Sequence, residues 1–120
     1  MAKIMLIDDE RSTADLLKMF LELDGFSVVT CPTLEAARSQ ITADLQALVI
    51  DRNLAREVVG TQLLIEIRAG QTLLPTDIPV IITSGDDRRE QEALEAGATK
   101  FLLKPFSPGE LSADLQALIQ

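Results

Sequence analysis

Five short apolar runs lie along this chain of 120 residues, and stretches with helical spacing of their apolar side chains separate them. Strands separated by about 10–15 residues of helical pattern are typical of parallel sheets with right-handed crossovers. Three of the runs are almost wholly apolar, as strands buried on both faces are. The pattern therefore predicts an α/β fold with a parallel sheet. The expected strands are Lys3–Ile7, Phe26–Cys31, Ala47–Ile50, Pro79–Thr83 and Lys100–Leu103.

The stretches after these runs predict helices. They are expected to begin near Ser12, Leu34, Thr61, Asp87 and Pro108. Asp24-Gly25 is a stop signal for the first helix, and Ser107-Pro108 supplies a cap and a favoured first residue for the last. The apolar stripe of the first helix is expected at Leu16, Leu17, Phe20 and Leu23. That of the last helix is expected at Leu111, Leu115, Leu118 and Ile119.

Acidic side chains stand directly after two of the apolar runs. Asp8, Asp9 and Glu10 follow the first run, and Asp51 follows the third. The carboxyl ends of parallel strands form the ligand crevice of an open α/β sheet. Carboxylates crowded there repel one another unless a cation lies between them, and hard oxygen ligands beside a phosphoryl group suit Mg²⁺. This crevice is where the function is expected.

The composition excludes several classes of function. A net charge of −8 argues against direct nucleic-acid binding, which needs a basic face. The sequence has neither an apolar run of about 18 residues, as a membrane span would need, nor a signal peptide. The chain has no histidine, so its chemistry falls to carboxylate, hydroxyl and lysine groups. The single cysteine, Cys31, excludes an internal disulfide and suits a reducing cytosol, so a cytoplasmic location is expected.

Four landmarks follow one another in a recognisable order: Asp8-Asp9-Glu10, Asp51, Ser84-Gly85 and Lys104-Pro105-Phe106. With these landmarks at the ends of strands, the chain resembles the receiver domain of bacterial two-component response regulators over essentially its whole length. The resemblance implies one domain over residues 1–120. It also implies a flavodoxin-like, doubly wound sheet with strand order 2-1-3-4-5, and five helices divided between its two faces.

The resemblance assigns phosphoryl transfer to the acidic residues. It implies that Asp51 takes a phosphoryl group from a phosphohistidine of a sensor histidine kinase or a phosphotransfer protein. A carboxylate is ionised at neutral pH, so it needs no general base. The implied ligands of Mg²⁺ are Asp9 directly, Asp51 itself and the backbone carbonyl of Asn53. Asp8 is expected to hold the ion through water or from outside the ligand shell. A simpler alternative is that Asp8 and Asp9 only cap the following helix.

The resemblance also assigns a lysine and a hydroxyl to the phosphoryl group. Lys104 is expected to place its ammonium on Asp51 and then on the phosphoryl group, and the Lys104–Pro105 bond is expected to be cis. Ser84 is the expected hydroxyl, because the small Gly85 follows it. Thr83 takes that place if the strand register differs by one residue, since only one of two adjacent side chains can face the phosphoryl group.

Switching and decay are assigned to neighbouring positions. Phe101 matches a switch aromatic that turns inward when the hydroxyl moves, although an ordinary core phenylalanine is the competing interpretation. The side chains of Asn53 and Asp86 are expected to set the rate at which the phosphoryl group is lost. The altered face would then bind a downstream protein or an output domain, or form a phosphorylation-dependent homodimer.

Two features depart from the family pattern. The usual Met-Pro pair after the phosphoacceptor is absent, so the loop from Arg52 to Gly60 is expected to be longer or more mobile. Two residues are missing between Ser84 and Ala96, which is expected to shorten the loop or first turn of the fourth helix.

Three alternatives stay open from the sequence. The chain is either a response regulator as such or a receiver module excised from a longer response regulator or hybrid kinase. An interaction module without phosphorylation would lack Asp51, an acidic ligand or Lys104, and all are present. An aspartate-dependent phosphatase would need a carboxylate at position 53, which is an asparagine. The expectation is a protein that is not an enzyme, except toward its own phosphoryl group.

Overall fold

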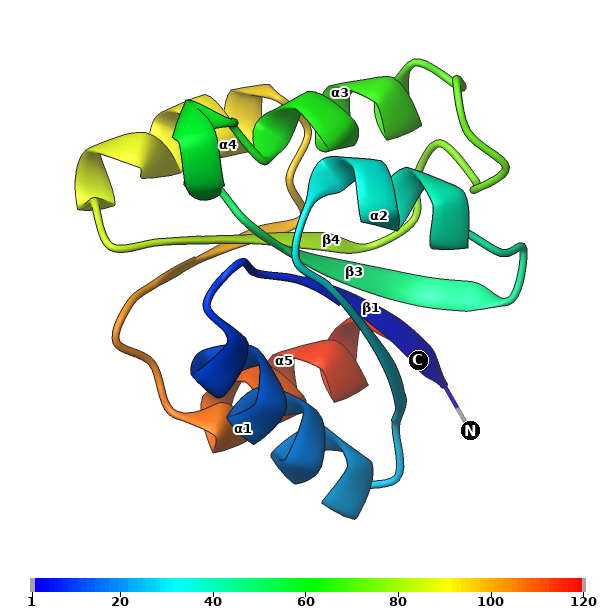
Figure 1. Cartoon of the computed structure of the whole chain (residues 1–120). Helices are drawn as coiled ribbons and strands as arrows, with labels where there is room; N and C mark the ends of the chain where they lie inside the picture. The colour runs from blue at the N-terminus through cyan, green and yellow to red at the C-terminus, as the bar shows by residue number, and fades with distance from the viewer. Residues whose placement is uncertain (1, 120) are drawn as a thin grey trace.

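A computed structural model describes residues 2–119 as a five-stranded sheet with helices on both faces (Figure 1). The strand order is β2-β1-β3-β4-β5 and every neighbouring pair is parallel, as predicted. The strands are β1 (Lys3–Ile7), β2 (Ser27–Cys31), β3 (Leu45–Asp51), β4 (Val80–Ser84) and β5 (Lys100–Leu103). The helices are α1 (Arg11–Leu23), α2 (Leu34–Gln40), α3 (Thr61–Arg68), α4 (Glu90–Glu95) and α5 (Pro108–Ile119). The outer residues of the expected domain, 1 and 120, lie outside the described part.

The sheet separates two apolar cores, because successive side chains of a strand point to opposite faces. In β1, Ile4 and Leu6 pack toward α1 and α5, whereas Met5 and Ile7 pack toward α2 and α3. Figure 1 shows α1 and α5 on one face and α2, α3 and α4 on the other. Both faces of the central strands are therefore buried, which is why their sequences are continuously apolar.

The first helix begins and ends close to the predicted residues, but its buried face differs from the expected stripe. It ends at Leu23 with Asp24 as its C-cap, and Gly25 then takes a φ of 96°, which favours glycine. The buried face consists of Ala14, Leu17 and Leu21. Leu16 and Leu23 are 51% and 80% exposed, so the prediction that they belong to the apolar stripe was wrong.

The last two helices differ in length and in the residues that they bury. The α5 helix follows the prediction: Ser107 Oγ accepts the N–H of Glu110, and Leu111 and Leu115 are buried. The predicted start at Asp87 is a 3₁₀ turn, and α4 follows it with six residues. Ala93 is the one buried residue of α4.

None of the helices within residues 2–119 has the length and apolar character to cross a lipid bilayer.

Candidate functional site

The acidic residues meet at the carboxyl edge of the sheet because β1 and β3 are neighbours. Ile7 pairs with Ile50, so Asp8 and Asp51 come next on adjacent strands. Carboxylate oxygens of Asp8, Asp9 and Asp51 lie within 4.8 Å of one another. Asp8 and Asp51 are buried, whereas Asp9 is exposed. The structure thus brings together three of the four acids that were predicted to converge. Glu10 lies outside this group, and its Oε1 accepts a hydrogen bond from Oγ of Ser12.

Lys104 reaches the same acids from β5. Its Nζ lies 2.9 Å from Oδ2 of Asp51 and 3.5 Å from Oδ2 of Asp8. The Lys104–Pro105 peptide bond is cis, as expected, and the Lys104 N–H donates to the carbonyl of Ser84 at 2.8 Å. The lysine is therefore fixed at its backbone to β4 and at its ammonium to the acids.

Backbone groups hold the two buried carboxylates in place. Oδ1 of Asp51 accepts the N–H of Asn53 at 3.1 Å, and Oδ1 of Asp8 accepts the N–H of Glu10 at 2.9 Å. Aspartate favours such turns because its side chain can accept the N–H two residues further on. In each case Oδ2 faces the ammonium of Lys104, so both carboxylates are oriented toward one shared space.

The electrostatics of this cluster do not cancel. Burial raises the pKa of Asp51 above its ordinary value, although the hydrogen bond and charge of Lys104 act in the other direction. Burial alone would lower the pKa of Lys104, but its contacts with Asp51 and Asp8 raise it overall. With both acids ionised and Asp9 beside them, three negative charges face one positive charge.

A divalent cation fits this donor set. The three acids offer carboxylate oxygens only, within reach of one ion, and a hard cation such as Mg²⁺ prefers such ligands. An ion there would also offset the excess negative charge. Asn53 stands at the edge of the cluster, where its N–H bonds to Asp51, and the ligand role of its carbonyl stays a prediction.

The two candidate hydroxyls lie on opposite faces of β4. Ser84 and Thr83 are both buried, and Oγ of Ser84 accepts the N–H of Asp86 at 3.1 Å. Ile82 pairs with Phe101, so Ser84, two residues further along, points to the face of Phe101. Thr83 pairs with Asp51 and points to the other face. Phe101 is half-buried against the core beneath α2, α3 and α4.

Arginines hold the two side chains that were expected to govern decay. Oδ1 of Asn53 accepts from Nη1 of Arg52 at 2.7 Å. Asp86 accepts from the backbone N–H and from the guanidinium of Arg88 at 3.0 Å. These hydrogen bonds lower the pKa of Asp86 to about 2.

The loop after Asp51 folds back on itself where the family has a proline. The N–H of Leu54 donates to the carbonyl of Val58 at 2.9 Å, and Arg56 and Glu57 adopt positive φ. The loop ends at Gly60, where a Cβ would overlap the carbonyl oxygen of Asp51. The expected mobility of this loop stays a prediction, and its closure and the need for glycine were missed from the sequence.

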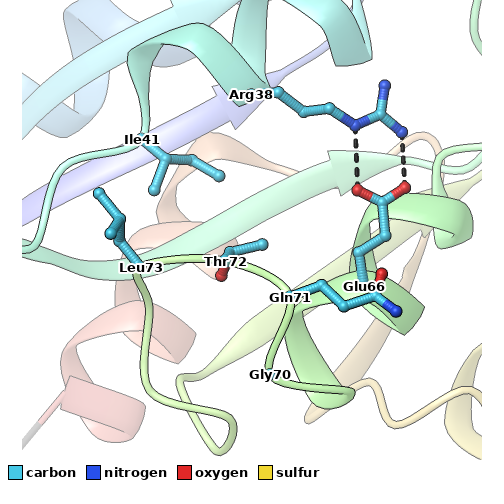
Figure 2. Close-up of a pocket in the computed structure, with 7 residues that line it drawn as sticks. All are labelled: Arg38, Ile41, Glu66, Gly70, Gln71, Thr72 and Leu73. Atoms are coloured by element: carbon cyan, nitrogen blue, oxygen red, sulfur yellow. Dashed lines mark hydrogen bonds and ion pairs between the residues drawn. The ribbon is translucent and has the colours of Figure 1, made fainter.

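A separate cavity of about 500 Å³ lies between α2 and the loop after α3 (Figure 2). Arg38 and Glu66 stand at its edge and form a bidentate pair, with distances of 3.0 and 2.6 Å. None of the acids, hydroxyls or the lysine of the carboxyl edge lines it. The site therefore does not coincide with this cavity.

The fold and the site together define a class of protein: a doubly wound α/β domain with an acidic pocket and an inward lysine at the carboxyl edge of its sheet. The family model described as the response regulator receiver domain matches residues 4–116. The chain therefore belongs to the response regulator receiver domain family.

Curated proteins with similar sequences support this assignment. The chain is 28% identical to the alkaline phosphatase synthesis transcriptional regulatory protein PhoP of Bacillus subtilis, over 98% of this chain and 48% of that protein. It is 30% identical to the transcriptional regulatory protein CpxR of Escherichia coli K12, over 100% of this chain and 50% of that protein. The chain thus spans about half the length of the curated relatives it matches.

Solved structures show the same fold. The receiver domain of the Francisella response regulator 1452 superposes with a TM-score of 0.87 and 27% identity, covering 99% of this chain and 97% of that one. The receiver domain of NtrX from Brucella abortus gives a TM-score of 0.85 and 25% identity, with 97% of each chain covered.

Proposed function

We propose that this chain is a phosphorylation switch of a two-component system, with Asp51 as its phosphoacceptor. The contact between Nζ of Lys104 and Oδ2 of Asp51, 2.9 Å long and inside a cluster of three acids, carries the proposal. The phosphoryl donor would be a phosphohistidine of a sensor kinase or phosphotransfer protein. The chain would act as a catalyst only on its own phosphoryl group, in the cytoplasm.

The transfer exchanges one bond to phosphorus for another. A carboxylate oxygen of Asp51 attacks the phosphorus of the donor, forming an O–P bond as the N–P bond breaks. The imidazole leaves with the electron pair of that bond and takes its proton from solvent. An ionised carboxylate needs no base for this attack, which suits a chain without histidine.

The residues of the acidic cluster would hold Mg²⁺. Asp9 and Asp51 would bind it directly, Asp8 through water, and the carbonyl of Asn53 would complete the set. When bound, the ion would supply positive charge that lets the phosphoryl group approach the acids.

Lys104 and Ser84 would respond to the new phosphoryl group. The ammonium of Lys104 already touches Asp51 and would pass to a phosphoryl oxygen. The hydroxyl of Ser84 would donate to another oxygen and give up its bond with the N–H of Asp86. Phe101 shares the face of Ser84, so its ring would move into the space that the hydroxyl leaves.

The phosphoryl donor would dock beside the first helix. A groove there is lined by α1 and the segment after β5, with Leu16 and Phe106 on its walls and Lys104 at its edge. The exposure of Leu16, which the sequence placed in the core stripe, fits a contact surface for the donor. An apolar side chain in this place would keep water from the reacting atoms while the partner is bound.

The output would pass through the face formed by α4, β5 and α5. The curated relatives named above are transcriptional regulators, and one solved neighbour, at 27% identity and a TM-score of 0.84, is described as the BeF3-activated DrrB receiver domain. These names support a receiver that changes this face on phosphorylation and then contacts a downstream protein, an output domain or a second copy.

Labelling with acetyl phosphate in the presence of Mg²⁺ tests the proposal. Wild-type protein is expected to gain one acid-labile phosphoryl group per chain, and Asp51→Asn none. Asp44→Asn is the matched control, because Asp44 is an exposed acid beside Lys3, and it should label as the wild type does. Retained labelling in Asp51→Asn would refute the assignment, and continuous release of phosphate by turnover would indicate an enzyme instead.

A further inference from the structure

The fourth helix buries little apolar surface, and an ion pair adds to its attachment to the domain. Within α4, Ala93 is the one buried residue, whereas α3 buries four and α5 buries three. Leu94, the one large apolar side chain of α4, is 46% exposed. Apolar burial fixes a helix in proportion to the area it removes from water, so α4 gains little from this source.

The carboxylate of Glu92 attaches α4 to the domain through an ion pair with Arg52. Nε of Arg52 donates to Oε1 of Glu92 at 2.9 Å, and Nη2 donates to Oε2 at 3.3 Å. Arg89 adds a third contact to Oε2 at 3.3 Å. The Arg52 side chain is only 14% exposed, so this bidentate pair is shielded from water on the arginine side. These bonds lower the pKa of Glu92, and Arg52 contributes most.

The other partner of this pair stands directly after the proposed phosphoacceptor. The backbone of Arg52 is fixed, because its N–H donates to Thr83 at 2.8 Å and its carbonyl accepts from Gly60 at 2.7 Å. The Arg52 guanidinium therefore reaches across from the end of β3 to α4. A displacement of α4 away from β3 must stretch or break its bonds to Glu92.

We propose that the Arg52–Glu92 pair is a latch that holds α4 in the position of the unphosphorylated state. The inference rests on the proposed function, since it assumes that phosphorylation of Asp51 moves the face containing α4. A contact made in only one of two states favours that state by its own free energy. The latch therefore opposes activation, and Arg52 acts as a positioning residue for α4.

The expected size of the effect follows from the geometry. Exposed ion pairs contribute little, but a bidentate guanidinium–carboxylate pair with one shielded partner lies at the upper end of the range. We expect its loss to shift the equilibrium toward the active state by roughly 3- to 10-fold. A ligand specific to the active state should then bind tighter by the same factor.

Beryllofluoride with Mg²⁺, a mimic of the phosphoryl group, is the probe. Its apparent dissociation constant would be measured by amide NMR for the wild type, Arg52→Gln, Glu92→Gln and the double variant. Each single change is expected to tighten binding, and the double variant should gain no more than a single one. This cycle isolates the pair from the separate effects of adding or removing charge near Asp51.

The Arg38–Glu66 pair is the matched control. It has the same bidentate chemistry but joins α2 to α3, as Figure 2 shows. Arg38→Gln should leave beryllofluoride affinity within about two-fold of wild type, because it does not touch α4. Hydrogen exchange of the α4 amides without ligand gives a second readout, faster in Arg52→Gln and Glu92→Gln and unchanged in Arg38→Gln.

The outcomes separate the latch from the function it assumes. Binding of beryllofluoride by the wild type, with unchanged affinity and unchanged α4 exchange in both single variants, would overturn the latch alone. Additive effects in the double variant would also overturn it. Failure of the wild type to bind beryllofluoride would overturn the proposed function, and with it the latch as part of a switch.

Discussion

The two ends of the sheet differ in how well their charged side chains are paired. At the carboxyl end, Asp8, Asp9 and Asp51 face the single ammonium of Lys104. At the amino end, the guanidinium of Arg68 is surrounded by acceptors. It donates to the carbonyls of Gly97, Thr76 and Ile78 at 2.8–2.9 Å.

This difference separates residues that serve stability from residues that serve chemistry. A partly buried cation whose hydrogen bonds are satisfied holds segments of the chain together, and it has no donor left for a ligand. A group of acids with too few cations costs the fold free energy, and it can recover that cost by binding a cation or a phosphoryl group with one. Substitutions at the two ends should therefore have opposite effects on stability and phosphorylation.

The largest effect on stability is expected at the amino end, for Arg68→Met. The change keeps the apolar stem but removes three charge-assisted hydrogen bonds, so we expect the free energy of unfolding to fall by about 2–3 kcal/mol. Urea denaturation would measure this fall. Arg68→Lys should recover only part of it, since one ammonium cannot reproduce the fork of a guanidinium. A loss of acetyl phosphate labelling under folding conditions would contradict the separation of the two ends.

An opposite effect of intermediate size is expected for Asp51→Asn. Burial raises the pKa of Asp51, so its ionised form is less favourable in the folded protein than in the unfolded chain. Asparagine removes that charge and keeps one oxygen that can accept from Lys104. We expect the free energy of unfolding to rise by about 1 kcal/mol, a usual gain when a group that destabilises a functional site is removed. Thermal unfolding without Mg²⁺ would measure it, and a clear fall would show that the contact with Lys104 outweighs the cost of burial.

The smallest effect concerns the pH dependence of the Arg38–Glu66 pair. The hydrogen bond from Arg38 lowers the pKa of Glu66 in the folded state. The unfolded chain therefore takes up this proton first as the pH falls. At a pH above the ordinary pKa of glutamate, the pair should stabilise the fold by about 0.5 kcal/mol, after allowance for solvent screening. This stabilisation should be lost as the pH falls through the lowered pKa of Glu66. The free energies of unfolding of wild type and Glu66→Gln, measured by denaturation from neutral pH to a pH below the pKa of Glu66, should converge at low pH.

Much of the fold and the convergence of the site could be predicted from local patterns. Apolar runs separated by helical patterns predicted the strands, and the parallel order then placed Asp8 and Asp51 side by side. The buried face of α1 was missed in part, because leucine spacing alone did not show which side of that helix meets the sheet. The exposed Leu16 and Leu23 satisfy the spacing as well as buried residues do.

The contacts that were missed link residues far apart in the chain. Arg52 and Glu92 are 40 residues apart, and Arg68 and Gly97 are 29 apart. Charged side chains occur throughout an acidic chain, so no sequence pattern marks which of them will meet. Gly60 is similar, since its need for glycine arises from the nearby carbonyl of Asp51 and not from any turn motif.

The single buried residue of α4 has a consequence for how this helix responds to salt. Charge–charge attraction is screened over about 8 Å at physiological ionic strength and over about 3 Å at 1 M, whereas apolar contacts do not weaken in this way. The contacts between Arg52 and Glu92, at 2.9 and 3.3 Å, are shorter than the physiological screening length, so the placement of α4 should change little at that ionic strength. At about 1 M salt α4 should loosen, while α5, anchored by Leu111 and Leu115, should not.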